Sequence, residues 1–137
     1  MVSSVRTWLD VKHAGPSASL AQRGRSADAL NPLMGVGYYE SVTKKMGAAD
    51  DFYRLFMVPG MYHCGGGVGP STFDAFTPLV EWVEKGTAPA SIVGSRIADG
   101  KVIRTRPLCP YPQVATYKGS GSVDDAASFA CGVRPTQ

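Results

Sequence analysis

One stretch of the 137-residue chain, residues 52–70, decides much of the expected fold, and it reads FYRLFMVPGMYHCGGGVGP. Its first part holds the apolar run 55–58, which Pro59 stops, and such a short run is typical of a buried strand. Its second part holds His63 and Cys64 among glycines, which let a backbone adopt positive φ angles and approach a reacting centre closely. The stretch therefore predicts a strand that leads into a loop, and loops fed by rigid strands are where catalytic groups concentrate.

A helix is predicted before this strand. Asn31 is a suitable N-cap, and Pro32 fits the first helical position, where its missing N–H is not needed. Apolar side chains then recur every four residues on what we take as one helical face, and a glycine follows as a natural stop: Met34, Tyr38, Val42, Met46 and Gly47. We expect an amphipathic helix over residues 32–46.

A second helix is predicted after the glycine loop. Ser71 and Asp74 resemble a capping box, with Asp in the place of Glu or Gln, and Gly86 with Pro89 marks the end of the helix. One face is expected to carry Phe73, Phe76, Val80 and Val83. The side chains expected in the core are Phe73, Phe76, Trp82 and Val83.

The remaining segments are less regular. Residues 91–97 and 101–106 flank the sequence Ala98-Asp99-Gly100, and an Asp-Gly pair favours a tight β-hairpin turn. The tail, residues 107–137, is expected to be loop-like, with at most a short helix near 124–129. Residues 1–26 are expected to be a poorly specified N-terminal segment, with little strand character between 12 and 25, before one domain over residues 27–137.

The order of these elements indicates an α/β fold. A helix, a strand, a loop and a second helix in succession argue for part of a parallel sheet. A single parallel strand cannot bury itself, so its neighbouring strands would have to come from elsewhere, or the hairpin would have to replace them. We therefore expect an exposed sheet edge and, through it, possible self-association of the chain.

Composition narrows the classes of protein further. Hydrophobic residues make up 44% of the chain and charged residues 18%, which fits one modest globular domain. The net charge of +3 comes from 14 Lys and Arg against 11 Asp and Glu without a basic cluster, so no nucleic-acid partner is expected. No apolar run approaches the roughly 18 residues of a membrane helix, and no signal peptide is visible at the N-terminus. No membrane partner is expected.

The chain has three cysteines, Cys64, Cys109 and Cys131, so one of them is unpaired within the chain. None forms a C-x-x-C pair, and their spacings match no zinc signature, so no metal site is expected. A disulfide between Cys109 and Cys131 is favoured over a zinc site, because it would close a loop rich in Gly, Pro and Ser. Disulfides are typical of exported proteins, which contrasts with the absence of a visible signal peptide.

His63 is the candidate general base. A Ser-His-acid triad needs a carboxylate behind the imidazole, and in α/β-hydrolases the chain order is nucleophile, acid, histidine. Asp28 suits the acid, because one helix and one strand fit between it and His63, whereas Asp50 and Asp51 fall at the opposite end of that strand. No serine before Asp28 lies in a G-x-S-x-G elbow, and the glycine-serine loop 119–122 is a weak signal. The nucleophile is therefore expected to be absent from this chain.

The quoted stretch and several later ones resemble the tannase and feruloyl esterase family. The later ones are residues 76–86 (FTPLVEWVEKG), 104–115 (RTRPLCPYPQVA), 117–121 (YKGSG) and 129–131 (FAC). The resemblance covers about residues 27–131 and rests on highly specific motifs. It implies the C-terminal part of an α/β-hydrolase fold, with a β-hairpin and a disulfide-closed tail.

The resemblance also implies roles for individual residues. His63 is similar to the catalytic histidine of the family, and Asp28 to the acid of its triad. Cys64 is similar to a cysteine that pairs with one beside the catalytic serine, and that partner is missing here. Cys109 and Cys131 are similar to a family disulfide. No cofactor is implied, and the catalytic serine, the oxyanion donors and the lid with its calcium site are expected to lie outside this chain.

The function implied is that of a carboxylic ester hydrolase acting on phenolic-acid esters, so the expected partner of the intact protein is a small-molecule ester. We expect this chain to represent its C-terminal fragment, which a truncated or frame-shifted reading frame would produce. The intact family is expected to be secreted or periplasmic. The alternative is a non-catalytic remnant or a small binding protein.

Overall fold

The computed structural model describes residues 17–23, 31, 33–62 and 65–133. The sequence predictions for Asp28, His63 and Cys64 therefore concern residues outside the described part of the chain. The described elements follow one another as β1 (Ser17–Arg23), α2 (Leu33–Met46), β2 (Tyr53–Pro59), β3 (Thr72–Phe73), α3 (Phe76–Lys85), β4 (Ile92–Ala98), β5 (Lys101–Leu108), β6 (Gln113–Tyr117), η1 (Ala126–Ser128) and β7 (Phe129–Val133).

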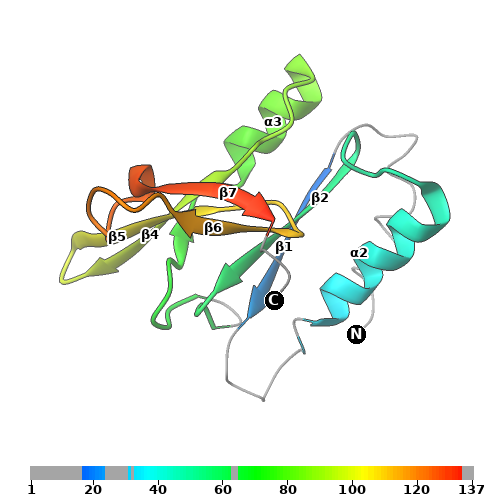
Figure 1. Cartoon of the computed structure of the whole chain (residues 1–137). Helices are drawn as coiled ribbons and strands as arrows, with labels where there is room; N and C mark the ends of the chain where they lie inside the picture. The colour runs from blue at the N-terminus through cyan, green and yellow to red at the C-terminus, as the bar shows by residue number, and fades with distance from the viewer. Residues whose placement is uncertain (1–16, 24–30, 32, 63–64, 134–137) are drawn as a thin grey trace.

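The strands form one parallel pair and two antiparallel groups. β1 and β2 are parallel, β3, β4 and β5 form an antiparallel sheet in that order, and β6 pairs with β7. Figure 1 shows α2 on one side of the β1–β2 pair and the antiparallel strands on the other, with α3 projecting from one end. The fold therefore combines parallel strands with helices and antiparallel hairpins, in the α/β class that was expected.

Strand β2 is the centre of the molecule. Leu55, Phe56 and Val58 have no exposed surface. Because side chains alternate across a strand, Tyr53 and Leu55 pack toward α2, where Tyr39 and Ala49 join them. Phe56 and Val58 pack toward the antiparallel sheet, in a cluster completed by Met61, Ile92 and Leu108. The prediction of a buried strand is confirmed, and the strand is covered on both faces.

Strand β1 corrects one prediction. The segment 12–25 was expected to have little strand character, yet residues 17–23 pair with residues 53–59 along the full length of β2. The sequence of β1, SASLAQR, holds a single large apolar residue, Leu20, and shows no clear alternation. Its strand conformation depends on pairing with a segment 36 positions later (53−17), and such tertiary context routinely overrides local propensity.

Helix α2 has the predicted bounds but a different buried face. Its single buried residue is Tyr39, and Val36, Tyr38 and Val42 pack partly around it. Met34 is 66% exposed, against the prediction of an apolar stripe from Met34 to Met46. A four-residue step advances about 40° beyond a full turn, so three steps carry a side chain about 120° around the helix. The row of residues from Met34 to Met46 therefore turns around the helix, and its ends leave the buried face.

Helix α3 ends as predicted, at Gly86 in the left-handed conformation, whose N–H donates to the Trp82 carbonyl oxygen. Its start differs, because Asp74 alone accepts hydrogen bonds from the N–H groups of Phe76 and Thr77, at 2.9 and 3.0 Å. The capping box with Ser71 is not formed.

The expected core face of α3 is also wrong for two residues. Phe76 and Val83 are 74% and 52% exposed, while Trp82 is buried and Phe73 is partly buried. The Arg54 guanidinium lies 5.5 Å from the centre of the Trp82 ring and donates to the Pro89 carbonyl oxygen at 2.6 Å. Trp82 therefore faces β2, and the Phe76 side of the helix faces outward.

The antiparallel part confirms the predicted hairpin and corrects the tail. Asp99 and Gly100 both have positive φ, 50° and 71°, as a tight turn between β4 and β5 requires. The tail is not loop-like, because β6 and β7 pair over five residues each. The predicted disulfide between Cys109 and Cys131 is present, with Cα atoms 5.6 Å apart, and it joins the end of β5 to β7.

Candidate functional site

The parallel strands β1 and β2 end at the same edge of the sheet. Their ladder pairs residue 23 with residue 59, so Arg23 and Pro59 are the last partners of the register. The chain reaches Asp28 five positions after β1 (28−23) and His63 four positions after β2 (63−59). The two candidate triad residues thus follow strand ends that lie side by side, although their own placement is outside the described residues.

The loop that carries His63 is held at its base by backbone hydrogen bonds. Gly69 N–H donates to the Gly60 carbonyl oxygen at 2.9 Å, and Met61 forms a bridge with Gly67. Tyr62 N–H donates to the Gly66 carbonyl oxygen at 3.4 Å. Met61 is buried in the core cluster with Phe56 and Val58. The described backbone on both sides of positions 63 and 64 is therefore fixed to the end of β2. We name residues 60–69 the histidine loop.

Two glycines of the histidine loop are required by close backbone approach. A side chain on Gly69 would collide with the carbonyl oxygen of Pro59, and one on Gly67 would collide with that of Gly60. Gly67 also has a φ of 89°, which side-chain-bearing residues rarely adopt. The glycine-rich composition noted in the sequence therefore has a steric cause: it lets the two arms of the histidine loop lie against each other.

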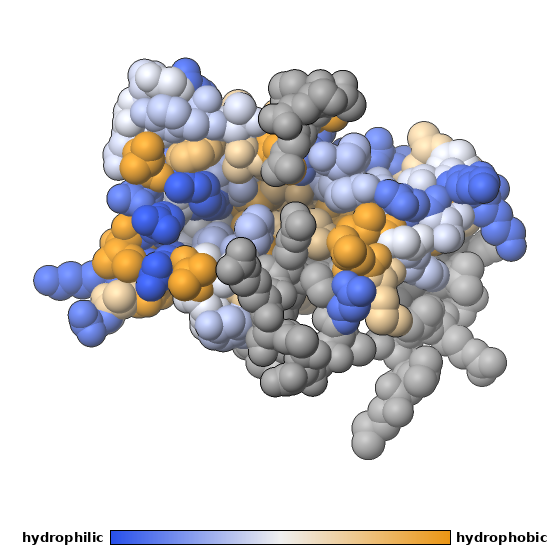
Figure 2. Space-filling model, turned by 60° about the horizontal axis from the view of Figure 1, so that its bottom comes forward, coloured by the Kyte–Doolittle hydropathy of each residue, from blue (hydrophilic) through white to orange (hydrophobic). Residues whose placement is uncertain are grey.

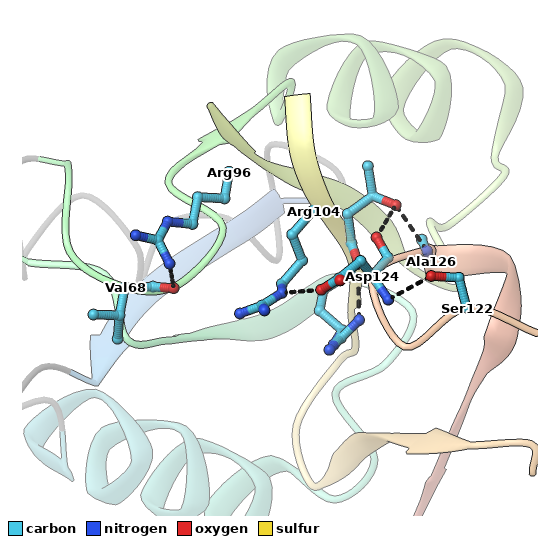
Figure 3. Close-up of polar contacts among 8 residues, drawn as sticks. Val68, Arg96, Arg104, Ser122, Asp124 and Ala126 are labelled. Carbon is cyan, nitrogen blue, oxygen red and sulfur yellow. Dashed lines mark hydrogen bonds and ion pairs between the residues drawn. The ribbon is translucent and has the colours of Figure 1, made fainter. Parts of the chain in front are cut away.

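The histidine loop and Pro70, which follows it, contact the antiparallel sheet. Pro70 lies over Gly94 of β4, where a Cβ atom would stand 3.0 Å from the Pro70 Cβ. Arg96, also on β4, donates from Nη1 to the Val68 carbonyl oxygen at 3.3 Å (Figure 3). The side chains of Tyr62 and Val68 are 53% and 66% exposed, so the outer side of the loop faces solvent.

The sequence placed Arg96, Arg104 and Arg106 in the predicted hairpin but indicated no contacts for their side chains. In the structure Arg104 Nε donates to Asp124 Oδ1 at 2.6 Å, and the Arg106 guanidinium lies 3.8 Å from the centre of the Phe129 ring. The strand assignment alone could not reveal these contacts, because Asp124 and Phe129 lie about twenty residues later in the chain. An alignment outward from the Asp99-Gly100 turn would have paired Arg96 with Ile103, because the ladder shifts by one residue between Arg96 and Ile97.

The opposite end of β2 has its own polar contacts. Tyr39 donates from its hydroxyl to Asp50 Oδ1 at 3.2 Å, and burial, followed by the charge of Asp50, raises the pKa of Tyr39 to about 12. Tyr111 donates to Glu40 Oε1 at 2.6 Å, and this hydrogen bond raises the pKa of Tyr111. Asp50 is thus engaged before β2 begins, at the end away from the histidine loop.

Within the described residues, no group of three or more His, Cys, Asp or Glu side chains is arranged to hold a metal ion. The helices of that same part are too short or too polar to cross a membrane.

A model of the family described as tannase and feruloyl esterase matches residues 20–132. The chain belongs to the tannase and feruloyl esterase family. The match begins inside β1, seven positions before residue 27, where the resemblance was expected to begin (27−20). The resemblance itself is confirmed.

Relatives from bacteria and fungi share this part of the family. The chain is 50% identical over 115 residues to a mono(2-hydroxyethyl) terephthalate hydrolase of Piscinibacter sakaiensis, a match of 82% of this chain and 19% of that protein. It is 40% identical over 119 residues to a probable feruloyl esterase of Arthroderma benhamiae, covering 82% of this chain and 22% of that protein. The chain therefore spans about a fifth of the length of these relatives.

Solved structures of the tannase and feruloyl esterase family share the fold. Feruloyl esterase B from Aspergillus oryzae superposes with a TM-score of 0.73 at 28% identity, over 82% of this chain and 26% of that one. A tannin acyl hydrolase from Aspergillus niger superposes with a TM-score of 0.70 over 90% of this chain and 24% of that one. At 20% identity the second likeness concerns the fold alone.

Proposed function

We propose that this chain supplies the histidine and the acid of a carboxylic ester hydrolase of the tannase and feruloyl esterase type. The observation that carries the proposal is the parallel register of β1 and β2, whose last partners are Arg23 and Pro59. In open α/β sheets, ligands bind beyond the carboxyl ends of the strands. Asp28 and His63 follow those two ends within five residues, in the acid-then-histidine order of α/β-hydrolases.

The chemistry follows from these roles. A serine hydroxyl attacks the ester carbonyl while His63 accepts its proton, and the same histidine then protonates the leaving alcohol. Asp28 holds the imidazole in the required tautomer and stabilises its charged form. We propose that the serine comes from outside these 137 residues, because no serine of the chain lies in a nucleophile elbow. Cys64 would then bridge to a cysteine beside that serine.

The names of the relatives suggest the class of substrate. A terephthalate monoester and feruloyl esters are both esters of aromatic acids. We therefore propose aromatic-acid esters as the substrates of the whole protein. The Cys109–Cys131 disulfide supports an oxidising compartment, so we propose that the whole protein is secreted or periplasmic.

A domain transplant tests this function. Residues 20–132 would replace the matching segment of the Piscinibacter sakaiensis hydrolase. The chimera would be assayed for hydrolysis of mono(2-hydroxyethyl) terephthalate, the ester that the name of this relative gives. The chimera is expected to hydrolyse the ester, and His63→Ala or Asp28→Asn is expected to lower kcat about a thousandfold or more. Asp51→Asn is the matched control, because this exposed carboxylate precedes β2 at its other end, and it should change kcat less than about twofold.

The outcomes separate the roles. A folded, active chimera in which Asp28→Asn keeps full activity would remove Asp28 from the triad, and a folded chimera without activity would favour the alternative of a non-catalytic binding protein. The isolated chain is expected to show no hydrolysis of p-nitrophenyl or phenolic esters above background. Turnover by the isolated chain that disappears in His63→Ala would contradict this expectation and require a nucleophile within the chain.

A further inference from the structure

Two arginines extend the inward-facing row of the antiparallel sheet. On β4 the buried residues Ile92 and Gly94 alternate with the exposed Val93, so the next residue on the inner face is Arg96. On β5 the inner row runs back from the buried Leu108 through Arg106 to Arg104. On the sheet face that packs on β2, buried apolar residues therefore give way to arginines toward the turn end of the hairpin.

Arg96 and Arg104 lie directly opposite each other across the β4–β5 ladder. Residues in such a pair share one face, and like charges in these positions are destabilising. Figure 3 shows both side chains on the same side of the strands, with Arg96 reaching Val68 and Arg104 reaching Asp124. The chain therefore keeps two positive charges side by side at the histidine loop.

These charges are only partly neutralised. Arg104 forms an ion pair with Asp124 at 2.6 Å, but Arg96 hydrogen-bonds to a neutral carbonyl oxygen, that of Val68, at 3.3 Å. Among the described residues no carboxylate lies within 4.0 Å of Arg96. Arg106 adds a third positive charge, and its pKa is lowered by desolvation first and then by the charge of Arg104. The surroundings of the pair are therefore net positive.

The guanidinium groups keep free donors for a ligand. Each guanidinium carries five N–H donors in a planar fork that matches the two oxygens of a carboxylate. Among the described residues, the hydrogen bonds of this pair use Nη1 of Arg96 and Nε of Arg104, which leaves the other donors of both side chains available. Beside them, the Val68 side chain is 66% exposed and provides an apolar surface. Figure 2 shows charged and hydrophobic side chains adjoining on the left of the molecule, where the β4–β5 hairpin lies.

We propose that Arg96 and Arg104 form a binding site for the carboxylate of a small organic anion, with the apolar part of that anion against Val68. The site adjoins the histidine loop, but binding there requires neither a serine nor hydrolysis. It therefore goes beyond the proposed ester hydrolysis and can be tested without it. An organic carboxylate is favoured over a polyphosphate, because the pair borders the exposed apolar side chain of Val68, which the apolar part of an organic anion would cover and a polyphosphate would not.

The test is an equilibrium titration of the full ¹⁵N-labelled chain with terephthalate, followed by NMR chemical shifts at several fixed chain concentrations, so that shifts caused by self-association are separated from those caused by the ligand. Saturable shifts are expected at the Arg96 and Arg104 side-chain Nε–H signals and at the Val68 and Gly69 amides. Arg96→Gln should weaken binding about tenfold to a hundredfold, as expected for the loss of a charged hydrogen bond. Arg96→Lys, which keeps the charge but loses the fork, should bind with intermediate affinity.

The matched control is Lys101→Gln, which removes the same charge from an exposed position of the same hairpin. It should change the affinity less than about twofold, because one exposed charge outside the site contributes little. The double variant Arg104→Gln/Asp124→Asn removes the ion pair as a unit, so that no carboxylate is left unpaired, and it should also weaken binding. Spectra of each variant without ligand show whether the fold is retained.

Three results would overturn the proposal. These are the absence of saturable shifts at millimolar terephthalate, an unchanged affinity in folded Arg96→Gln, or an equal loss in Lys101→Gln. Inorganic phosphate is the competing probe, and phosphate binding as tight as that of terephthalate would contradict selectivity for an organic carboxylate. None of these results depends on whether the transplanted chimera hydrolyses esters.

Discussion

The two halves of the molecule differ in how their strands find partners. In the first half, β1 and β2 pair in parallel across 36 positions of sequence, with α2 between them. In the second half, β4 and β5 are joined by the Asp99-Gly100 turn, and β6 pairs antiparallel with β7, which the Cys109–Cys131 disulfide ties to the end of β5. The parallel half depends on distant segments, whereas the antiparallel half is built from local pairs.

The halves meet at β2. Tyr111 N–H donates to the Leu55 carbonyl oxygen at 2.7 Å, and Phe56 forms a bridge with Pro110. The segment that follows Cys109 thus covers the side of β2 that β1 leaves free. The two halves therefore have different roles: the strands of the parallel half end at one edge, a few residues before the candidate triad positions, and the antiparallel half supports the strand that leads into the histidine loop.

The largest expected effect concerns the assembly state of the parallel half. Within the described residues β1 pairs only with β2, so its other edge is unpaired, and an unpaired parallel edge invites pairing with another strand. We expect the isolated chain to self-associate at micromolar concentration and to unfold with a broad, low-temperature transition. Sedimentation velocity across a concentration series with thermal unfolding is the measurement. A monomer at every concentration with a sharp transition well above about 60 °C would contradict it, since ordinary domains melt at 45–65 °C.

The second effect concerns the disulfide bond of the antiparallel half. Replacing both Cys109 and Cys131 by Ala should lower the free energy of unfolding by about 2–4 kcal/mol, because the bridge restricts the unfolded chain. Chemical denaturation under oxidising conditions measures this loss. Cys64→Ala is the control and should leave stability nearly unchanged if Cys64 is the free thiol. Non-reducing peptide mapping that finds Cys64 bridged to either of the others would overturn the assignment.

The third effect compares a glycine of the histidine loop with a glycine of helix α2. Gly69→Ala should cost about 1–3 kcal/mol, because its Cβ would collide with the backbone of Pro59 and Gly60. Gly37→Ala is the matched substitution inside α2, where a Cβ meets nothing within 4 Å, and it should stabilise by about 0.5–1 kcal/mol. Denaturant midpoints measure both. Equal changes in the free energy of unfolding for the two substitutions would contradict a collision at Gly69.

The same contrast explains what could be predicted from the sequence. The local features were found: the helix over 32–46, the strand that ends near Pro59, the Asp99-Gly100 hairpin and the Cys109–Cys131 disulfide. Each of these depends on residues close together in sequence or on a family motif. The order of strand, histidine loop and helix also pointed to the candidate site, although the positions of His63 and Asp28 remain predictions.

The features that were missed depend on distant contacts. β1 has a sequence of small and polar residues, and only its pairing with β2 makes it a strand. Trp82 was expected in the core and is buried, but Phe76 and Val83 were expected beside it and are exposed, because the contact of Trp82 with Arg54 sets which side of α3 faces β2. The strands β6 and β7 lie in a stretch without clean alternation, where the bridge and the contact of Arg106 with Phe129 hold them to β5.

A smaller effect concerns the tyrosine that joins α2 to the start of β2. Burial and Asp50 raise the pKa of Tyr39 to about 12 in the folded chain, above its usual value of 10.0. Its contribution to stability is therefore fully present below pH 10 and is lost as the pH rises through about 12. Denaturant midpoints measured from neutral to alkaline pH should fall more steeply in the natural chain than in Tyr39→Phe. Parallel curves for the two proteins would contradict the contribution of Tyr39.

The smallest effect concerns the start of α3. Hydrogen bonds from Thr77 and then Phe76 lower the pKa of Asp74, because they favour its charged form. Its contribution is therefore present above the unfolded pKa of about 3.8–3.9 and is lost as the pH falls through the lower folded value. Asp74→Ala should lower the denaturant midpoint at neutral pH, and Asp74→Asn, which keeps a capping oxygen, should recover part of the loss. Because α3 buries only Trp82, the change should be smaller than that of Gly69→Ala. A loss in Asp74→Ala that stays constant below pH 3 would show that the carboxylate is not the source of the effect.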